Sequence, residues 1–103
     1  MTSSGFDREL NEARQELLAH NFARALPRYE RLTRRYPGVS VIWFEYGNAA
    51  SSLRELDRAD RAWRRAIELA PENAELVSLI GHQYLALRQP ERARECFVSA
   101  ASK

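Results

Sequence analysis

The chain has 103 residues, of which 45% are hydrophobic and 29% are charged. This length suits one domain, and four Gly and four Pro argue against collagen-like, low-complexity and fully disordered chains. The net charge of +2 lies far below the excess that a dedicated nucleic-acid binder carries. Composition therefore predicts one folded domain over residues 1–103.

The sequence also bears on the compartment. No stretch approaches the roughly 20 apolar residues of a membrane helix, and charges stand in the opening segment where a signal peptide would be apolar. The single cysteine, Cys96, cannot form an intramolecular disulfide, which fits a reducing compartment. We attribute the predominance of arginine over lysine to GC-rich coding. We therefore expect a cytoplasmic, bacterial protein without a membrane partner.

A spacing of 34 residues organises the chain. Residues of like size recur at this spacing: Ala25, Ala59 and Ala93; Tyr29, Trp63 and Phe97; Gly47 and Gly81; Pro37 and Pro71. Such a period is typical of stacked helix pairs, each of which buries its apolar face on the next. It divides the domain into three units of about residues 6–39, 40–73 and 74–103.

The first unit is the least regular. In strict register its first helix, over residues 6–19, would bury three carboxylates: Glu9, Glu12 and Glu16. A register shifted by one residue, with one residue lost from the following turn, buries an apolar stripe instead: Leu10, Ala13 and Leu17, with Phe6 one turn earlier. We adopt the shifted register and keep the strict one as the alternative. The second helix, over residues 22–36, buries Ala25, Tyr29 and Leu32.

The next two units follow the helical i, i+3, i+4, i+7 spacing. The helices over residues 40–53 and 74–87 bury Trp43, Tyr46, Gly47 and Ala50, and Val77, Ile80, Gly81 and Tyr84. Their partners, over residues 54–70 and 88–103, bury Ala59, Trp63 and Ala66, and Ala93, Phe97 and Ala100. Gly47 and Gly81 lie inside helices, where glycine costs about 1 kcal/mol against alanine. We infer that Trp63 and Phe97 approach them too closely for a side chain.

These residues carry a family resemblance. The segments W-F-E-Y-G-N-A-A from Trp43 and A-D-R-A-W-R-R-A from Ala59, closed by Pro71, resemble a tetratricopeptide repeat. Residues 74–103 repeat the pattern less closely. The resemblance implies an all-α fold: a right-handed α-solenoid of three helix-turn-helix units, with six antiparallel helices.

The resemblance also implies a concave groove, lined by the first helix of each unit, that binds a peptide or partner domain. Its side chains would lie one or two positions off the buried stripe: Asn11, Gln15, Val41, Phe44, Asn48, Ser51, Ser52, Glu75, Ser78, His82 and Leu85. If the first helix follows the strict register, Arg14 takes the place of Asn11 and Gln15 in the groove. Asn48 matches the family best, because an Asn at this place in many members hydrogen-bonds an extended peptide. Phe44 is either a groove anchor or a contact between repeats.

Charge divides between the two sides of the expected array. The first helices are net acidic and the second helices net basic, with the densest patch at Arg24, Arg28, Arg31, Arg34 and Arg35. A groove ligand should therefore be neutral or basic, and an acidic partner would prefer the convex outside. The simpler interpretation is that the arginines form a solvent-exposed helix face without a partner, with i, i+4 ion pairs such as Asp57–Arg61 and Asp60–Arg64.

Two partners are disfavoured. Family members that bind the acidic tails of heat-shock chaperones use a clamp of Lys, Asn and Arg, and the matching places here, which include Glu45, Glu75 and Leu79, lack its cations. Nucleic acid would need aromatic rings among the convex arginines. Tyr29 and Trp63 belong to the core instead, so this contact stays a weak alternative.

No catalytic or cofactor motif is present. His20, His82 and Cys96 lack a partner at a motif spacing, and no Gly-rich phosphate loop or metal-ligand pattern occurs. We therefore expect a non-enzymatic interaction module without cofactor or metal. The alternative is a scaffold or self-associating part of a larger protein. The last helix lacks the usual polar cap, so Val98 and Ala101 would face a second copy or a following segment.

Overall fold

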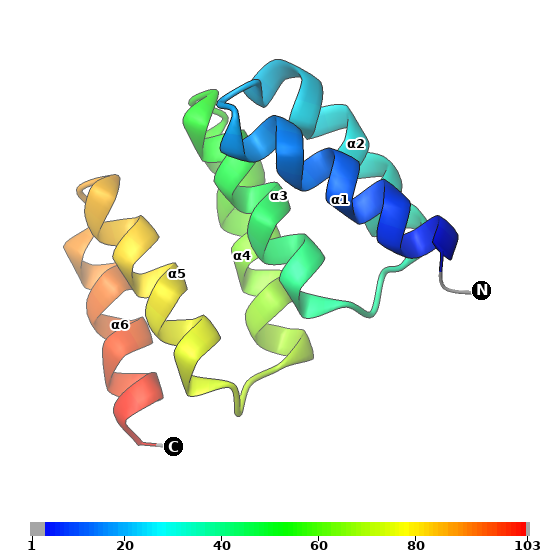
Figure 1. Cartoon of the computed structure of the whole chain (residues 1–103). Coiled ribbons are helices and arrows are strands. Elements are labelled where there is room, and N and C mark those ends of the chain that lie inside the picture. Colours follow the sequence, from blue (N-terminus) through cyan, green and yellow to red (C-terminus); the bar gives the residue numbers. More distant parts are fainter. Residues whose placement is uncertain (1–3, 103) are drawn as a thin grey trace.

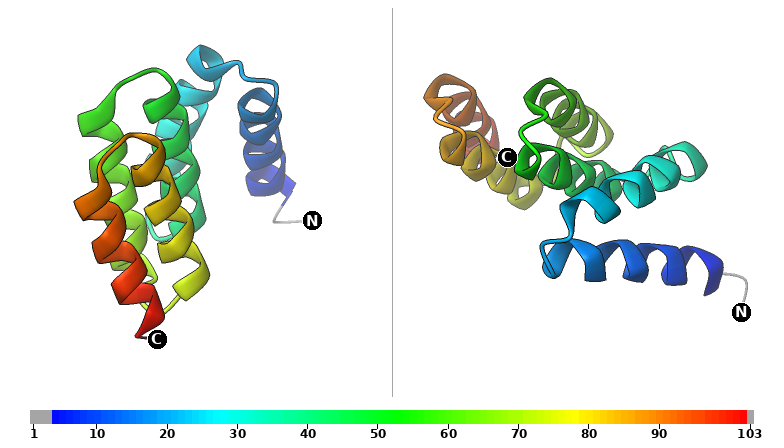
Figure 2. Two further views of the ribbon diagram at one scale, coloured as in Figure 1. Left: turned by 90° about the vertical axis from the view of Figure 1, so that its left-hand side faces the viewer. Right: turned by 90° about the horizontal axis from the view of Figure 1, so that it is seen from above.

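The computed structural model describes residues 4–102, and these form six α-helices without a strand. They are α1 (Ser4–Leu18), α2 (Phe22–Arg35), α3 (Ser40–Ser52), α4 (Leu56–Leu69), α5 (Ala74–Ala86) and α6 (Pro90–Ala101). Figure 1 shows three successive antiparallel pairs. Seen from above, α1, α3 and α5 lie on one side of the array and α2, α4 and α6 on the other (Figure 2). This confirms the all-α solenoid of three helix pairs.

The turns inside the three pairs have the same backbone geometry. The left-handed conformation recurs every 34 residues, at His20, Arg54 and Arg88. A backbone hydrogen bond then closes each helix end, from Asn21 N to Glu16 O at 2.8 Å and at the equivalent places in the other units at 2.9 Å. The prediction that the first turn has lost one residue was therefore wrong.

The buried face of α1 is nevertheless the shifted one. Leu10 and Ala13 are buried, and Phe6 and Leu17 are half-buried against the core. The turn keeps its full length, so the 34-residue register of α1 is unchanged. We infer that α1 instead is rotated about its own axis relative to the first helices of the other units. Ala13 then stands where the other units have Gly47 and Gly81.

The two helical glycines admit the large rings of the partner helices. A Cβ on Gly47 would lie 2.5 Å from Trp63 Cδ1, and one on Gly81 would lie 2.8 Å from Phe97 Cε1. Trp63 is fully buried at 0% exposure. Close approach therefore explains both glycines, as the sequence predicted.

The core differs from the predicted stripes in detail. Trp43, Tyr46, Phe97 and Ala100 are only half-buried. Among the buried residues that the stripes omit are Ile42, Ala49 and Leu76. The reason is that α3 contacts α2, α4 and α5, so its apolar residues cover more than one face. Within residues 4–102, no helix is both long and apolar enough to cross a membrane.

Candidate functional site

The predicted groove residues lie mainly on α3 and α5, which contact each other on the same side of the array. On α5, His82 is exposed, and Leu79 and Leu85 are 44% and 48% exposed. The remaining groove residues divide between half-buried and exposed. Val41, Phe44, Asn48, Ser51 and Ser78 are half-buried, whereas Ser52, Glu75, Asn11 and Gln15 are exposed.

Asn48 is oriented by the core. The indole Nε1 of Trp63 donates to Asn48 Oδ1 at 3.2 Å and to the carbonyl of Phe44 at 3.3 Å. Because an indole can only donate, the atom that faces it must be the amide oxygen. The Nδ2 group of Asn48 is thereby turned away from the ring, as a donor that other groups can use.

Several of the predicted groove residues have structural contacts too. Phe44 packs against the core in addition to accepting the indole hydrogen bond. The Ser51 hydroxyl donates to the carbonyl of Asn48 at 3.1 Å. His82 lies edge-on to Phe97, with ring centroids 5.0 Å apart. These three side chains therefore serve the fold as well as the surface.

A charged cluster joins α1 to the second helix pair. Arg14 Nε donates to both carboxylate oxygens of Glu45 at 3.0 Å, and the hydroxyl of the buried Tyr29 donates to Glu45 Oε1 at 2.8 Å. Burial, together with the charge of Glu45, raises the pKa of Tyr29 well above its ordinary value. Glu45 is thus neutralised, which makes this side of α3 less acidic than the residue count suggests.

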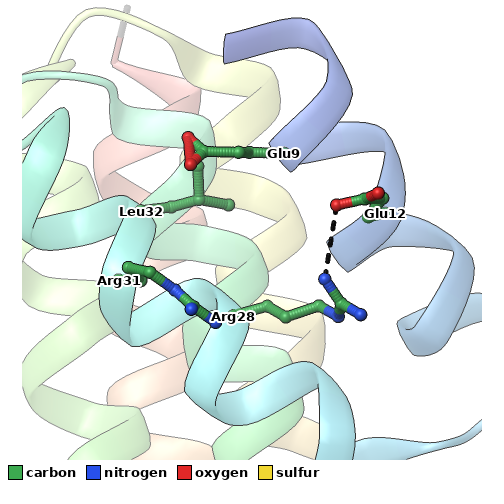
Figure 3. A pocket seen from close by; sticks show the side chains of 5 residues that line it. All are labelled: Glu9, Glu12, Arg28, Arg31 and Leu32. Carbon is green, nitrogen blue, oxygen red and sulfur yellow. Dashed lines mark hydrogen bonds and ion pairs between the residues drawn. The ribbon is translucent and has the colours of Figure 1, made fainter. Parts of the chain in front are cut away.

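Three carboxylates of α1 face α2. Arg35 pairs with Glu9 at 2.6 Å, and Arg28 pairs with Glu12 at 3.3 Å and with Glu16 at 3.9 Å. Figure 3 shows the small recess of about 110 Å³ along this seam, where Arg28 reaches Glu12. One buried oxygen, Glu9 Oε1, has no hydrogen-bond partner among the described residues. Much of the acidic charge of the first helices is therefore used in packing.

These pairs divide the predicted convex patch. Arg28 and Arg35 form ion pairs with carboxylates of α1. Arg24, Arg31 and Arg34 are exposed and make no ion pair within residues 4–102. Arg31 also lines the seam recess with Leu32. The patch is therefore less continuous than its spacing on α2 indicated.

Each junction between units is closed by a carboxylate, a tyrosine and an arginine. At the first, Glu30 Oε2 of α2 accepts from Arg58 Nη1 of α4 at 2.6 Å and from the Tyr46 hydroxyl of α3 at 3.4 Å. Burial, followed by the charge of Glu30, raises the pKa of Tyr46.

At the second junction, Asp60 Oδ1 of α4 accepts from the Tyr84 hydroxyl of α5 at 2.6 Å and from Arg92 Nη1 of α6 at 2.7 Å. Arg64 pairs with the other oxygen at 3.1 Å, which confirms the predicted Asp60–Arg64 pair. Burial and the hydrogen bond to Asp60 raise the pKa of Tyr84 well above its ordinary value. The corresponding Asp57–Arg61 pair is not formed within the described residues.

A larger recess lies on the outer side, between α2, α3 and α4. Its volume is about 430 Å³, and it is lined by Glu30, Trp43, Tyr46, Arg58, Arg61, Ala62 and Arg65. Tyr29 and Trp63 are buried as expected, but Trp43 and Tyr46 place two other rings among arginines. The expectation that aromatic interleaving is missing on the convex side, which considered Tyr29 and Trp63 alone, therefore does not hold at this recess.

Metal-ligating and thiol chemistry can be checked in the described residues. Within residues 4–102, no three His, Cys, Asp or Glu side chains are grouped so as to hold a metal ion. Cys96 is buried, and burial raises the pKa of its thiol, which disfavours the reactive thiolate. Val98 and Ala101, by contrast, are exposed on α6, Val98 at 62%.

Comparison with solved structures places this architecture. MamA (residue 41 to the end) from Desulfovibrio magneticus RS-1 superposes with a TM-score of 0.84 at 19% identity, over 96% of this chain and 56% of that one. MamA of strain MSR-1 superposes with a TM-score of 0.76 at 19% identity, over 91% and 54%. MamA of strain AMB-1 superposes with a TM-score of 0.75 at 19% identity, over 91% of this chain and 51% of that one. The chain thus spans about half the length of these structures.

Sequence comparison identifies the repeat itself. No curated protein sequence matches this chain. The family model described as tetratricopeptide repeat matches residues 40–73, the segment that holds α3 and α4. The helix pairs before and after it share its turn geometry and its 34-residue spacing. Residues 40–73 therefore match a tetratricopeptide repeat, and the six helices fit three units of this kind.

Proposed function

We propose that the chain is a non-enzymatic module that binds an extended peptide segment along the surface of α3 and α5. The observation that carries this proposal is the orientation of Asn48. Its Nδ2 group is a donor without a use in the helix pair, because Trp63 holds the other end of the amide. Exposed Leu79 and Leu85 on the neighbouring helix α5 offer apolar contacts. Together they suit a peptide backbone carbonyl and apolar peptide side chains.

The charges of this surface suit a neutral or basic peptide. Arg14 neutralises Glu45, whereas Glu75 at the start of α5 is exposed and makes no ion pair within the described range. The accessible side chains are otherwise polar or apolar: Ser52, Ser78, His82 and Leu85. An acidic peptide would meet only repulsion from Glu75, so acidic chaperone tails fit this surface poorly.

Replacing Asn48 by aspartate tests the donor directly. The substitution keeps an acceptor for Trp63, replaces the outward donor by an acceptor and adds one negative charge, so the comparison is made on peptides without basic residues. Peptides selected by the wild-type chain from a random library should bind Asn48→Asp about tenfold or more weakly, as expected for an unpaired buried carbonyl. Fluorescence anisotropy measures the affinity, and circular dichroism checks that the helices remain.

Two further variants sharpen this experiment. Leu79→Ala with Leu85→Ala should also weaken binding, because it removes exposed apolar surface from α5. Arg61→Glu, on the opposite side of the array, is the matched control and should leave the affinity unchanged. Equal affinity of wild type and Asn48→Asp for every selected peptide would refute the groove assignment.

The exposed end of α6 favours a second candidate, a scaffold that associates with itself. Val98 and Ala101 form a small apolar face on the last described helix. If two copies pack through it, light scattering after size exclusion should give a mass that rises with protein concentration. Val98→Glu should then return the mass to that of a monomer, and Arg34→Glu, an exposed position on α2, should not. A constant monomeric mass for the wild type would exclude this function.

A further inference from the structure

The recess between α2, α3 and α4 carries an inference that is independent of the groove. Three guanidinium groups of α4, from Arg58, Arg61 and Arg65, border it together with the rings of Trp43 and Tyr46. They follow one another at i, i+3 and i+7, which places them on one face of the helix. Its volume of about 430 Å³ is within the range of small ligand sites.

The three arginines do not serve the same purpose. Arg58 closes the junction by pairing with Glu30 at 2.6 Å, and it also pairs with Glu55 at 3.2 Å. Arg65 pairs only with exposed Glu68, one turn along the same helix, at 3.2 Å. Arg61 makes no ion pair or side-chain hydrogen bond within residues 4–102. Two of the three guanidinium groups are therefore available to an incoming anion.

The third repeat shows which of these residues the fold requires. At the positions that correspond to Arg58, Arg61, Arg65 and Trp43, it has Arg92, Glu95, Ser99 and Val77. Only the first is retained, and Arg92 makes the equivalent junction contact with Asp60. The scaffold thus tolerates a carboxylate, a hydroxyl and a small aliphatic group at the other three places. The cations and the indole of the second repeat are additions to the scaffold.

The indole is held in place at the border of the recess. Trp43 Nε1 donates to the carbonyl of Pro37 at 2.9 Å, and the ring centroid lies 6.1 Å from that of Tyr46. A planar or apolar group could therefore stack on Trp43 while an adjacent carboxylate meets Arg61 or Arg65.

We propose that this recess binds a short acidic protein segment in which carboxylate side chains flank an aromatic one. A protein segment fits better than nucleic acid, because Glu30, Glu55 and Glu68 alternate with the arginines. A phosphate backbone would have to pass these carboxylates, whereas separate carboxylates of a peptide can each select a guanidinium. The site is on the outside of the array, so a groove ligand and this segment can bind together.

The test uses a defined probe: a short fluorescein-labelled peptide in which glutamates flank one phenylalanine. Its anisotropy should rise with protein concentration at low salt and less so at high salt. The Arg61→Glu, Arg65→Ser double variant carries the residues native to the third repeat, so it should keep the fold. It should weaken binding by about tenfold or more. Trp43→Leu should weaken it by roughly threefold to tenfold, through lost stacking.

Controls separate this site from the rest of the molecule. Arg94→Glu changes charge on α6, away from the recess, and Asn48→Asp changes the groove; both should bind the probe as the wild type does. The proposal is overturned if the wild type does not bind the probe or if the double variant binds it equally well. It is also overturned if a lysine version of the peptide or a labelled oligothymidylate binds more tightly.

Discussion

Replacing Gly47 by leucine should destabilise the chain by about 3 kcal/mol or more, through overpacking of the tightest helix contact. Even the Cβ alone would lie 2.5 Å from Trp63 Cδ1 and 2.9 Å from Trp63 Cε2. The indole cannot retreat freely, because it is buried and donates to Phe44 and Asn48. The gain in helix propensity, about 1 kcal/mol, is too small to offset the clash.

Urea unfolding followed by far-UV circular dichroism measures this effect. Substitutions at two other glycines serve as comparisons. Gly81→Leu should destabilise less, because the nearest atom to its Cβ is the ring edge of Phe97 at 2.8 Å. Gly5→Ala on α1 should be neutral or stabilising, since no atom lies within 4 Å of its Cβ. Gly47→Leu with unchanged stability would show that Trp63 does not occupy this position.

Replacing Asp60 by alanine should lower the free energy of unfolding of the third repeat by about 2 kcal/mol. It would leave the hydroxyl of Tyr84, which is only 4% exposed, without its acceptor, and Arg64 and Arg92 without their carboxylate. Asp60 is 24% exposed and Arg92 is 41% exposed, so solvent screening keeps the effect below that of a fully buried pair.

The position of the loss can be measured as well as its size. Because Asp60 joins α4 to α5 and α6, amide hydrogen exchange should accelerate first in α5 and α6, while α1 to α3 stay protected. Glu68→Ala removes another carboxylate of α4, from an exposed pair with Arg65, and should change stability by less than about 0.5 kcal/mol. Uniform acceleration over all helices would contradict the role assigned to Asp60.

The fold could be predicted because it rests on periodic features. The 34-residue spacing indicated the number of helices, and the pairing of Gly47 with Trp63 followed from size complementarity alone. The buried face of α1 was also visible, since Leu10, Ala13 and Leu17 form an apolar stripe, whereas the strict register would bury Glu9, Glu12 and Glu16. What the spacing could not show is that the turn before α2 keeps its full length while α1 rotates.

The surface was harder to predict, because one helix face can have two neighbours. Trp43 and Tyr46 follow the buried stripe, yet they lie at the border of α3 where the recess opens. Likewise, counting charges by helix could not show that Arg28 and Arg35 turn toward α1, or that Glu45 meets Arg14. Leu79 could have been found from its sequence signal, an apolar residue one position off the predicted stripe of α5, and the structure shows that it is exposed.

The junction contacts give the array a fixed order. Glu30 meets Tyr46 at the first junction and Asp60 meets Tyr84 at the second, and these residues occupy different places in their repeats. If the third repeat followed the first directly, Tyr84 would face Leu26 in place of Asp60, and Glu30 would face Ile80 in place of Tyr46. The repeats are therefore not interchangeable modules: each is matched to its own neighbour, and a shuffled or lengthened array would need new partners at every joint.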